Sequence, residues 1–286
     1  MRIVETIVEL EQALARWRGQ GETVALVPTM GNLHAGHLSL VEAAKQRADH
    51  VVVSIFVNPL QFGPGEDFAR YPRTPGEDRL KLQAFGVDLV FTPATTEIYP
   101  RSLDESTVVE VPQITAILCG AHRPGHFRGV TTVVAKLFNL VRPEVAVFGE
   151  KDYQQLQVIR QMVAELHFPV KIVSVPTVRE SDGLAMSSRN RYLSPGERAK
   201  AAKLYRCLCG IRDAVTAGES DFPALIAHQW GRLEQAGFNP EYLEIRRTDL
   251  APATPDDRPL VILAAARLGQ TRLIDNVVAP GSDSGD

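Results

Sequence analysis

The stretch VALVPTMGNLHAGH, residues 24–37, decides the fold class. Its first four residues form a short apolar run that is typical of a buried strand, and Pro28 ends that run. After the loop, apolar residues recur at helical spacing, at Leu38, Val41, Ala44 and Ala48. A buried strand that leads through a glycine-containing loop into a helix is the opening of a βαβ unit.

The same alternation continues through the first two thirds of the chain. Further strand-like runs occupy residues 51–57, 87–91, 145–148 and 170–175. Helix-like patterns lie between or after them, at 74–86, 130–141 and 156–166. Because strands that alternate with helices pair as right-handed crossovers, the sequence predicts an α/β fold with a parallel sheet.

The pattern changes after residue 176. Ser194-Pro195-Gly196-Glu197 reads as a capping box, and one helix is expected behind it to about residue 215. A second helix, around 226–233, ends at Gly237, and strand-like runs follow at 242–246, 260–265 and 272–277. We therefore expect a first domain over 1–176 and a smaller α+β domain over 177–286. The linker is expected between residues 175 and 194, and the polar tail, 281–286, is expected to fray.

Composition excludes several classes of protein. The 286 residues suffice for roughly two domains of about 150 residues, with 44% apolar and 23% charged residues. A net charge of −3 gives no basic excess for nucleic acid or an anionic membrane. The three cysteines, at 119, 207 and 209, form no disulfide framework and favour a reducing compartment. With no apolar run of 18 residues and no signal core, we expect a cytoplasmic protein.

The loop before the first long helix carries the strongest chemical signal. His34 and His37 are three residues apart, so on one helical turn they share a face. Gly31 and Gly36 let the backbone approach a ligand, and a helix N-terminus offers free N–H groups to a phosphate. Two alternatives stay open: a capping turn with two surface histidines, and a two-histidine metal site that would need a third ligand.

His34-Ala35-Gly36-His37 resembles the HIGH signature of nucleotidyl-transferring Rossmann-like enzymes, which include class I aminoacyl-tRNA synthetases. Those enzymes carry a second, serine-rich phosphate loop, and Met186-Ser187-Ser188-Arg189-Asn190 stands in its place. Ala185 replaces the usual leading lysine, and Arg189 could supply the positive charge. Taken alone, this stretch could also be an ordinary polar loop.

Three further stretches narrow the resemblance. They are FVNPLQFG at 56–63, RPGHFRGV at 123–130 and FGEKDYQQ at 148–155. With the two loops above, in this order, the chain resembles the pantothenate synthetase (pantoate–β-alanine ligase) family as far as about residue 194, and more loosely beyond. The family implies that (R)-pantoate, ATP and β-alanine give (R)-pantothenate, AMP and pyrophosphate through pantoyl adenylate.

The resemblance also implies roles for single residues. His37, with His34, would act on the phosphates; Gln61 and Gln155 would bind pantoate, and Gln61 would also approach β-alanine. ATP would contact Met30, Gly31, Asn32, Leu33, His34, Ala35, Gly36, His37, Gly149, Glu150, Lys151, Asp152, Val178, Met186, Ser187, Ser188 and Arg189. Magnesium would accompany ATP through ligands that the sequence does not name, and the family implies a homodimer. Without the resemblance, the glutamines could be surface amides, residues 150–152 a solvated turn, and Val178 linker packing.

Some residues receive no firm role. Asn58 is a candidate for capping or for contacting pantoate, and residues 63–67 read as a mobile flap onto which Tyr71 would pack. Arg123, His126 and Arg128 precede a helix near the expected site. Three other functions are alternatives: a nucleotidylyltransferase that keeps AMP on its product, a class I tRNA synthetase, and a nucleotide-binding module without catalysis. The stretches at 56–62 and 149–155 oppose the first, the lack of a basic surface opposes the second, and the presence of His34, His37, Lys151, Ser187 and Arg189 opposes the third.

Overall fold

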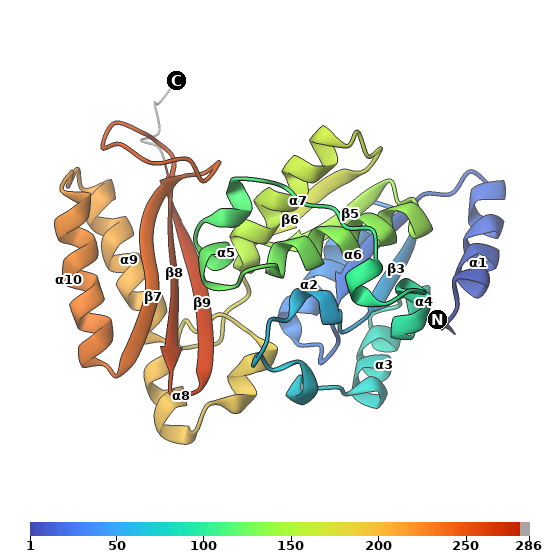
Figure 1. Cartoon of the computed structure of the whole chain (residues 1–286), viewed down its shortest axis with the longest axis horizontal. Coiled ribbons are helices and arrows are strands. Elements are labelled where there is room, and N and C mark those ends of the chain that lie inside the picture. The colour runs from blue at the N-terminus through green and yellow to red at the C-terminus, as the bar shows by residue number, and fades with distance from the viewer. Residues whose placement is uncertain (281–286) are drawn as a thin grey trace. The chain divides into compact units, whose positions relative to one another are not determined.

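The computed structural model describes residues 1–280, which form two compact units (Figure 1). The first comprises Met1–Glu150 and Gln154–Pro176, and the second takes Lys151–Tyr153 and the chain from Thr177 onward. The tail at 281–286, which we expected to fray, lies outside the described residues. No helix in the described part of the chain is both long and apolar enough to cross a membrane.

The first unit is built on a six-stranded sheet whose strand pairs are all parallel, in the order β1-β4-β3-β2-β5-β6. Its strands are β1 (Arg2–Val4), β2 (Val24–Thr29), β3 (His50–Ile55), β4 (Leu89–Phe91), β5 (Val145–Gly149) and β6 (Lys171–Val175). The predicted α/β fold with a parallel sheet is confirmed. The short strand β1 was not predicted, since three residues are too few to show a period.

Helices surround this sheet. They are α1 (Ile7–Gly19), α2 (Ala35–Lys45), α3 (Pro75–Ala84), α4 (Thr95–Ile98), α5 (Cys119–His122), α6 (His126–Val141) and α7 (Tyr153–Glu165), with the 3₁₀ turns η1 (Pro59–Gln61) and η5 (Glu150–Asp152) among the connections. Ala25 and Val27 of β2 share a buried cluster with Leu40 and Val41 of α2, while Leu26 is equally buried. Burial on both faces explains why the strands read as continuous apolar runs.

The strand order reverses direction between β2 and β5, which is where ligands bind in open parallel sheets. In the described chain these two strands pair only at Ala25–Val145 and Leu26–Ala146. The loop that leads to α2 and the end of β5 at Gly149 therefore lie at the carboxyl ends of two neighbouring strands.

The sequence suggested that β2 stops at Pro28, but the strand continues to Thr29. The early end of the pairing between β2 and β5 explains why Pro28 is tolerated. Thr29 accepts a hydrogen bond from the Phe56 N–H through its carbonyl, so the backbone groups of Thr29 face β3. Those of Pro28 then face β5, where the ladder has already ended, and its missing N–H breaks no sheet bond.

The second unit packs helices on a three-stranded antiparallel sheet, ordered β7-β8-β9 (Figure 1). Its elements are α8 (Pro195–Ala201), α9 (Lys203–Thr216), α10 (Phe222–Gln235), β7 (Phe238–Arg247), β8 (Leu260–Leu268) and β9 (Thr271–Ala279). The buried face of α9, with Leu204, Leu208 and Ile211, shares one apolar cluster with Ile262 of β8. The smaller α+β fold is confirmed, as is the capping box, in which Ser194 N–H donates to Glu197 Oε2 at 2.7 Å.

Two details differ from the expectation. The single helix expected over 195–215 is two helices, α8 and α9, with Ala202 between them in a turn that ends the first and caps the second. The stretch expected to be a linker belongs largely to the second unit: Arg179 and Ala185 form a β-bridge, and residues Ser188–Tyr192 form the 3₁₀ turn η6.

Candidate active site

The loop between β2 and α2 has a fixed backbone. Gly31 (φ +82°) and Asn32 (φ +49°) adopt left-handed conformations. The N–H groups of Asn32 and Leu33 donate to the two carboxylate oxygens of Asp78 on α3, at 2.9 and 2.8 Å. A side chain at Gly31 would come within 3.1 Å of the same carboxylate, which is why glycine is needed there.

Asp78 is itself held in place, with only 1% of its surface exposed. The Thr74 hydroxyl donates to it at 3.1 Å, and Lys81, one turn further along α3, donates to the Leu33 carbonyl at 2.9 Å. Hydrogen bonds to an ionised acceptor are among the stronger ones in proteins. Helix α3 therefore fixes the loop that the sequence assigns to ATP, a role for Asp78 that no sequence motif indicated.

His34 and His37 lie at the N-terminus of α2, and their ring centroids are 4.1 Å apart. His34 is the N-cap residue, and its backbone N–H donates to His37 Nδ1 at 3.3 Å. Because Nδ1 accepts, a neutral His37 carries its proton on Nε2 and offers that nitrogen as a donor. The capping-turn alternative thus describes part of the geometry, while both rings are half-buried rather than on the open surface.

Gln61 is a buried residue, 9% exposed, so the surface-amide alternative is wrong for it. Asn58 caps η1 by accepting the Leu60 N–H, and its Nδ2 donates to Gln61 Oε1 at 3.1 Å and to the Gly129 carbonyl at 3.0 Å. The amide oxygen of Gln61 thus accepts from Asn58, and its Nε2 points toward Met30, 3.0 Å from Sδ. Asn58 is a cap, one of its two predicted roles.

Tyr99 sets the orientation of Asn58. Its hydroxyl donates to Asn58 Oδ1 at 2.8 Å, so that oxygen accepts and Nδ2 must donate. Burial raises the pKa of Tyr99 well above its ordinary value, which keeps the hydroxyl protonated and able to donate. Tyr99 belonged to no motif in the sequence, and only the fold brings it to residue 58.

Helix α6 approaches Gln61 closely at Gly129. A methyl group at this position would overlap the Leu60 carbonyl and lie 2.5 Å from the Gln61 nitrogen. In the sequence, Gly129 is one residue of the RPGHFRGV stretch, far along the chain from Gln61, and nothing there indicates the contact. The glycine is therefore required by close packing of a helix against the turn that carries Gln61.

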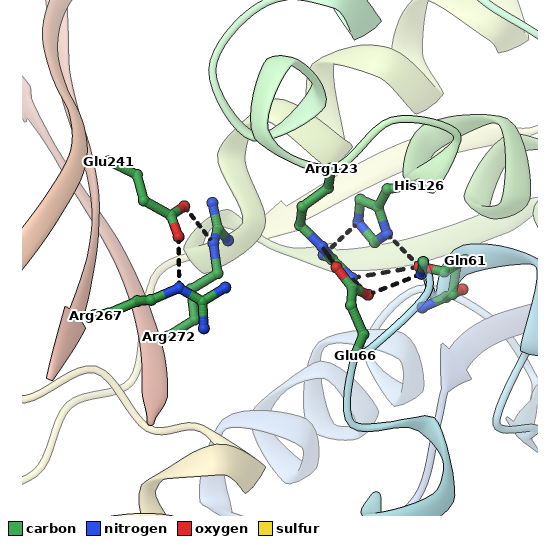
Figure 2. A network of polar contacts seen from close by, with 8 residues as sticks. Gln61, Glu66, Arg123, His126, Glu241, Arg267 and Arg272 are labelled. Carbon is green, nitrogen blue, oxygen red and sulfur yellow. Dashed lines mark hydrogen bonds and ion pairs between the residues drawn. The ribbon is translucent and has the colours of Figure 1, made fainter. Parts of the chain in front are cut away.

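A second network holds the main chain of Gln61 (Figure 2). His126 Nδ1 lies 2.8 Å from the Gln61 carbonyl, and Arg123 Nη2 donates to the same oxygen at 3.3 Å. Arg123 also forms a two-pronged ion pair with Glu66, with both N–O distances 2.6 Å. These bonds give Arg123 and His126 a structural role that the sequence left open.

The Arg123–Glu66 pair also anchors the stretch at 63–67, which the sequence predicted to be a mobile flap. Glu66 accepts the Gly63 N–H at 3.2 Å as well. Burial opposes ionisation of Glu66, yet the hydrogen bonds and charge of Arg123 outweigh it and hold the pKa of Glu66 below its usual value. In the structure, the ionised Glu66 carboxylate therefore ties this stretch to Arg123.

The FGEKDYQQ stretch follows β5 and is divided between the units. Gly149 and Glu150 belong to the first unit, and Lys151–Tyr153 to the second. Residues 150–152 form the turn η5, in which Lys151 Nζ lies 3.6 Å from Asp152 Oδ1 and both side chains are partly exposed. This agrees with the turn of the solvated-turn alternative. Gln154 is buried and bonds to the backbone at Ile114, Ile117 and Cys119, whereas Gln155 on α7 is partly exposed.

The remaining predicted residues are Val178 and 186–189, and they lie in one compact turn of the second unit, residues 178–189. The Met186 N–H donates to the Val178 carbonyl at 3.0 Å, which pairs two residues assigned to ATP. Ser187 caps η6 by accepting the Arg189 N–H at 3.2 Å, and this bond leaves its hydroxyl proton unused. Ser188 is buried and Arg189 half-buried, so the stretch is more ordered than an exposed polar loop.

A parallel sheet with a rigid glycine-containing loop and two histidines at its switch point defines a nucleotide-binding α/β enzyme. Comparison with known proteins then fixes the family. The model of the pantoate–β-alanine ligase family matches residues 2–278, and the chain belongs to this family. It is a ligase that joins pantoate to β-alanine, as the resemblance predicted.

Named relatives are similar to this chain over nearly its whole length. Pantothenate synthetase of Pseudomonas entomophila strain L48 is 57% identical over 278 residues, 97% of each chain, and that of Azotobacter vinelandii strain DJ is also 57% identical, over 97% of this chain and 98% of its own. The crystal structure of pantothenate synthetase from Thermus thermophilus has a TM-score of 0.92 and 50% identity, with 98% of this chain and all of that chain covered. The ligase from Francisella tularensis, complexed with β-γ ATP and β-alanine, has a TM-score of 0.84 and 34% identity over 98% of both chains.

Proposed function

We propose that this ligase works in two steps through pantoyl adenylate. A carboxylate oxygen of (R)-pantoate attacks the α-phosphorus of ATP, and the bond to the leaving pyrophosphate breaks. The β-alanine amine then attacks the acyl carbon, loses a proton, and releases AMP as the carbon–oxygen bond breaks. Neither step needs a covalent enzyme nucleophile, so the demand on the protein is positioning and stabilisation of phosphate charge.

One observation carries this proposal: the loop at 30–37 stands at the switch point with its backbone fixed by Asp78. A rigid loop at a helix N-terminus suits a phosphate chain, because its donors need not reorganise as charge develops. The complex of the Francisella relative with an ATP ligand and β-alanine supports ATP and the amine as substrates here.

His37 is the proposed donor to the phosphates. Its Nδ1 accepts the His34 N–H, so its Nε2–H is the donor, and it can stabilise oxygen charge without a change of tautomer. His34 is proposed to assist from the neighbouring ring, 4.1 Å away. The rest of the proposed ATP contacts are those implied by resemblance: 30–37, 149–152, Val178 and 186–189, with Lys151 and Arg189 supplying positive charge.

Gln61 is proposed to bind pantoate and to approach β-alanine. Its buried amide is oriented by Asn58, and its Nε2 is available to donate to a carboxylate or hydroxyl oxygen. Gln155, partly exposed on α7, is proposed as a second pantoate ligand.

Magnesium is proposed to arrive with ATP. Among the residues assigned to ATP, only Glu150 and Asp152 carry carboxylates, the protein ligands that a hard cation prefers. Most of the others offer hydrogen-bond donors, from imidazole, ammonium, guanidinium, hydroxyl and backbone groups, which fit phosphate oxygens. Phosphate oxygens and water would then supply most ligands of the ion. We also propose a homodimer, which rests on the family alone, and a cytoplasmic location, which the sparse cysteines favour.

The two-step proposal is tested by pyrophosphate release from Mg-ATP, first with pantoate alone and then with β-alanine added. A pantoate-dependent burst that β-alanine converts into steady turnover, with AMP and pantothenate as products, supports it. Release that requires β-alanine from the first turnover would contradict a separate adenylation step. Absence of pantoate-dependent release from folded protein would reject pantoate as the acid.

A further inference from the structure

Two neighbouring residues of β9, Asp275 and Asn276, are buried and polar, with 4% and 7% of their surfaces exposed. Burying a carboxylate costs free energy unless it is paired, and a buried ion pair seldom stabilises a fold more than apolar residues of the same size. The apolar cluster of this unit packs without them. A role in positioning other segments would account for their place in the interior.

Asp275 holds the 178–189 turn through Arg179. The Arg179 guanidinium donates to both carboxylate oxygens, at 2.7 and 2.9 Å, in a two-pronged pair. It also donates to the Gly183 carbonyl at 3.1 Å, and it lies 3.7 Å from the centre of the Tyr205 ring. Burial raises the pKa of Asp275, and the charge of Arg179 opposes that rise.

The consequence for the turn is a fixed backbone. Arg179 follows Val178 directly, and Val178 is hydrogen-bonded to Met186, the first residue of the serine-containing segment. Asn190, just after that segment, donates to the Ala185 carbonyl at 3.1 Å. Ala185 in turn forms a β-bridge with Arg179, so holding Arg179 in place fixes both ends of the segment that carries Ser187, Ser188 and Arg189.

Asn276 holds the other ATP segment of this unit. Its Nδ2 donates to the Lys151 carbonyl at 3.1 Å, and its own N–H donates to Asp275 Oδ1 at 2.8 Å. Two residues further on, the Tyr153 hydroxyl donates to the Thr248 carbonyl at 2.9 Å. The backbone of Lys151 is thus tied to the same dipeptide that clamps the 178–189 turn.

We propose that Asp275 and Asn276 are positioning residues for ATP. Together they fix Lys151 and the 178–189 turn relative to one another. The ammonium group of Lys151 and the segment with Ser187, Ser188 and Arg189 then contact the nucleotide at a fixed spacing. This inference rests on the proposed ATP roles of those two segments. In this proposal neither residue contacts the nucleotide itself: Asp275 acts through the Arg179 guanidinium, and Asn276 acts through the Lys151 carbonyl.

The test uses Asp275→Asn and Asn276→Ala in the full chain, with Glu241→Gln as the matched control. Glu241 on β7 pairs with Arg267 and Arg272, at 3.0 and 2.7 Å, so the control removes a similar ion pair from the same sheet without touching an ATP segment (Figure 2). We measure the Kd for a non-hydrolysable ATP analogue, the single-turnover rate of pyrophosphate release, the steady-state KM for pantoate, and Tm.

Both variants should weaken analogue binding or slow release by about tenfold or more, with KM for pantoate within about twofold, because misplacement of a positioned group by an ångström costs that much. The control should leave both ATP readouts within about twofold. Folded variants with unchanged analogue Kd and unchanged release would overturn the proposal. If Asp275→Asn does not fold, Asn276→Ala decides the question alone.

A double-mutant cycle separates positioning from general damage. If Asn276 acts through Lys151, Asn276→Ala should have almost no further effect on release in a Lys151→Ala background, whereas general damage would add to it. Additive effects would overturn the role of Asn276. Because analogue binding is measured without pantoate, a failure of the two-step proposal would leave this readout intact, so the two failures remain distinguishable.

Discussion

Replacing Asp78 with asparagine tests whether α3 organises the nucleotide loop. The carboxylate accepts backbone N–H groups at 2.9 and 2.8 Å and the Thr74 hydroxyl at 3.1 Å. Asparagine keeps one acceptor oxygen and turns its NH₂ group toward a backbone donor. One charge-assisted hydrogen bond is lost, worth about 1.5–3 kcal/mol, and a buried N–H is left without an acceptor. At about 1.4 kcal/mol per tenfold, kcat/KM for ATP should fall by about 10- to 100-fold.

The neighbouring carboxylate provides the control. Glu77 is on the same helix but exposed, and it forms an i,i+4 pair with Lys81 at 3.5 Å, so Glu77→Gln should cost less than about 0.5 kcal/mol. Steady-state kinetics with ATP and then pantoate varied, together with Tm, separate loop order from global stability. A folded Asp78→Asn enzyme with normal kcat/KM for ATP would refute the reasoning, whatever its Tm.

Three further substitutions test single roles. His37→Ala should lower the adenylation rate by about 10²- to 10⁴-fold with the fold intact by circular dichroism, and an unchanged single-turnover rate would remove His37 from the chemistry. Gln61→Ala should raise KM for pantoate far more than KM for ATP, because its oriented Nε2 is lost; equal effects would place Gln61 outside the pantoate pocket. Lys151→Ala should slow pyrophosphate release in a single turnover, and normal release would leave this lysine a structural residue.

Local pattern was enough to predict the parallel sheet and the α+β unit. The apolar runs at 51–57 and 145–148 are strands because both faces of the sheet are covered by helices, which removes any need for polar residues. The boundaries of the helices and strands were harder to predict from the sequence. Whether β2 continues through Pro28 depends on where β5 stops pairing, and the turn at Ala202 leaves the apolar spacing of α9 unbroken, so neither is visible in a sequence window.

The motifs predict which segments would carry the chemistry, but they do not show which residues hold those segments in place. Asp78 is 46 residues from Asn32 and was only one acidic residue in a helix pattern. Tyr99 lies 41 residues from Asn58, and Asp275 lies 96 residues from Arg179. Such partners depend on how elements pack, and the spacing along the chain carries no trace of them. A carboxylate within an otherwise strand-like apolar run, as at Asp275, was the one available signal, and it contributed to no prediction.

The close approach at Gly129 bears on attempts to make this enzyme more heat-resistant. A glycine inside a helix is a usual target for such work, since alanine favours a helix by about 1 kcal/mol. Here the added methyl group would press on the turn that carries Gln61. The overlap with the Leu60 backbone would cost more than the gain in helix propensity, because closely packed backbone must move to admit the methyl group. A replacement chosen at residue 129 from helix propensity alone would therefore lower the stability of the fold and displace the turn that carries Gln61 at the same time.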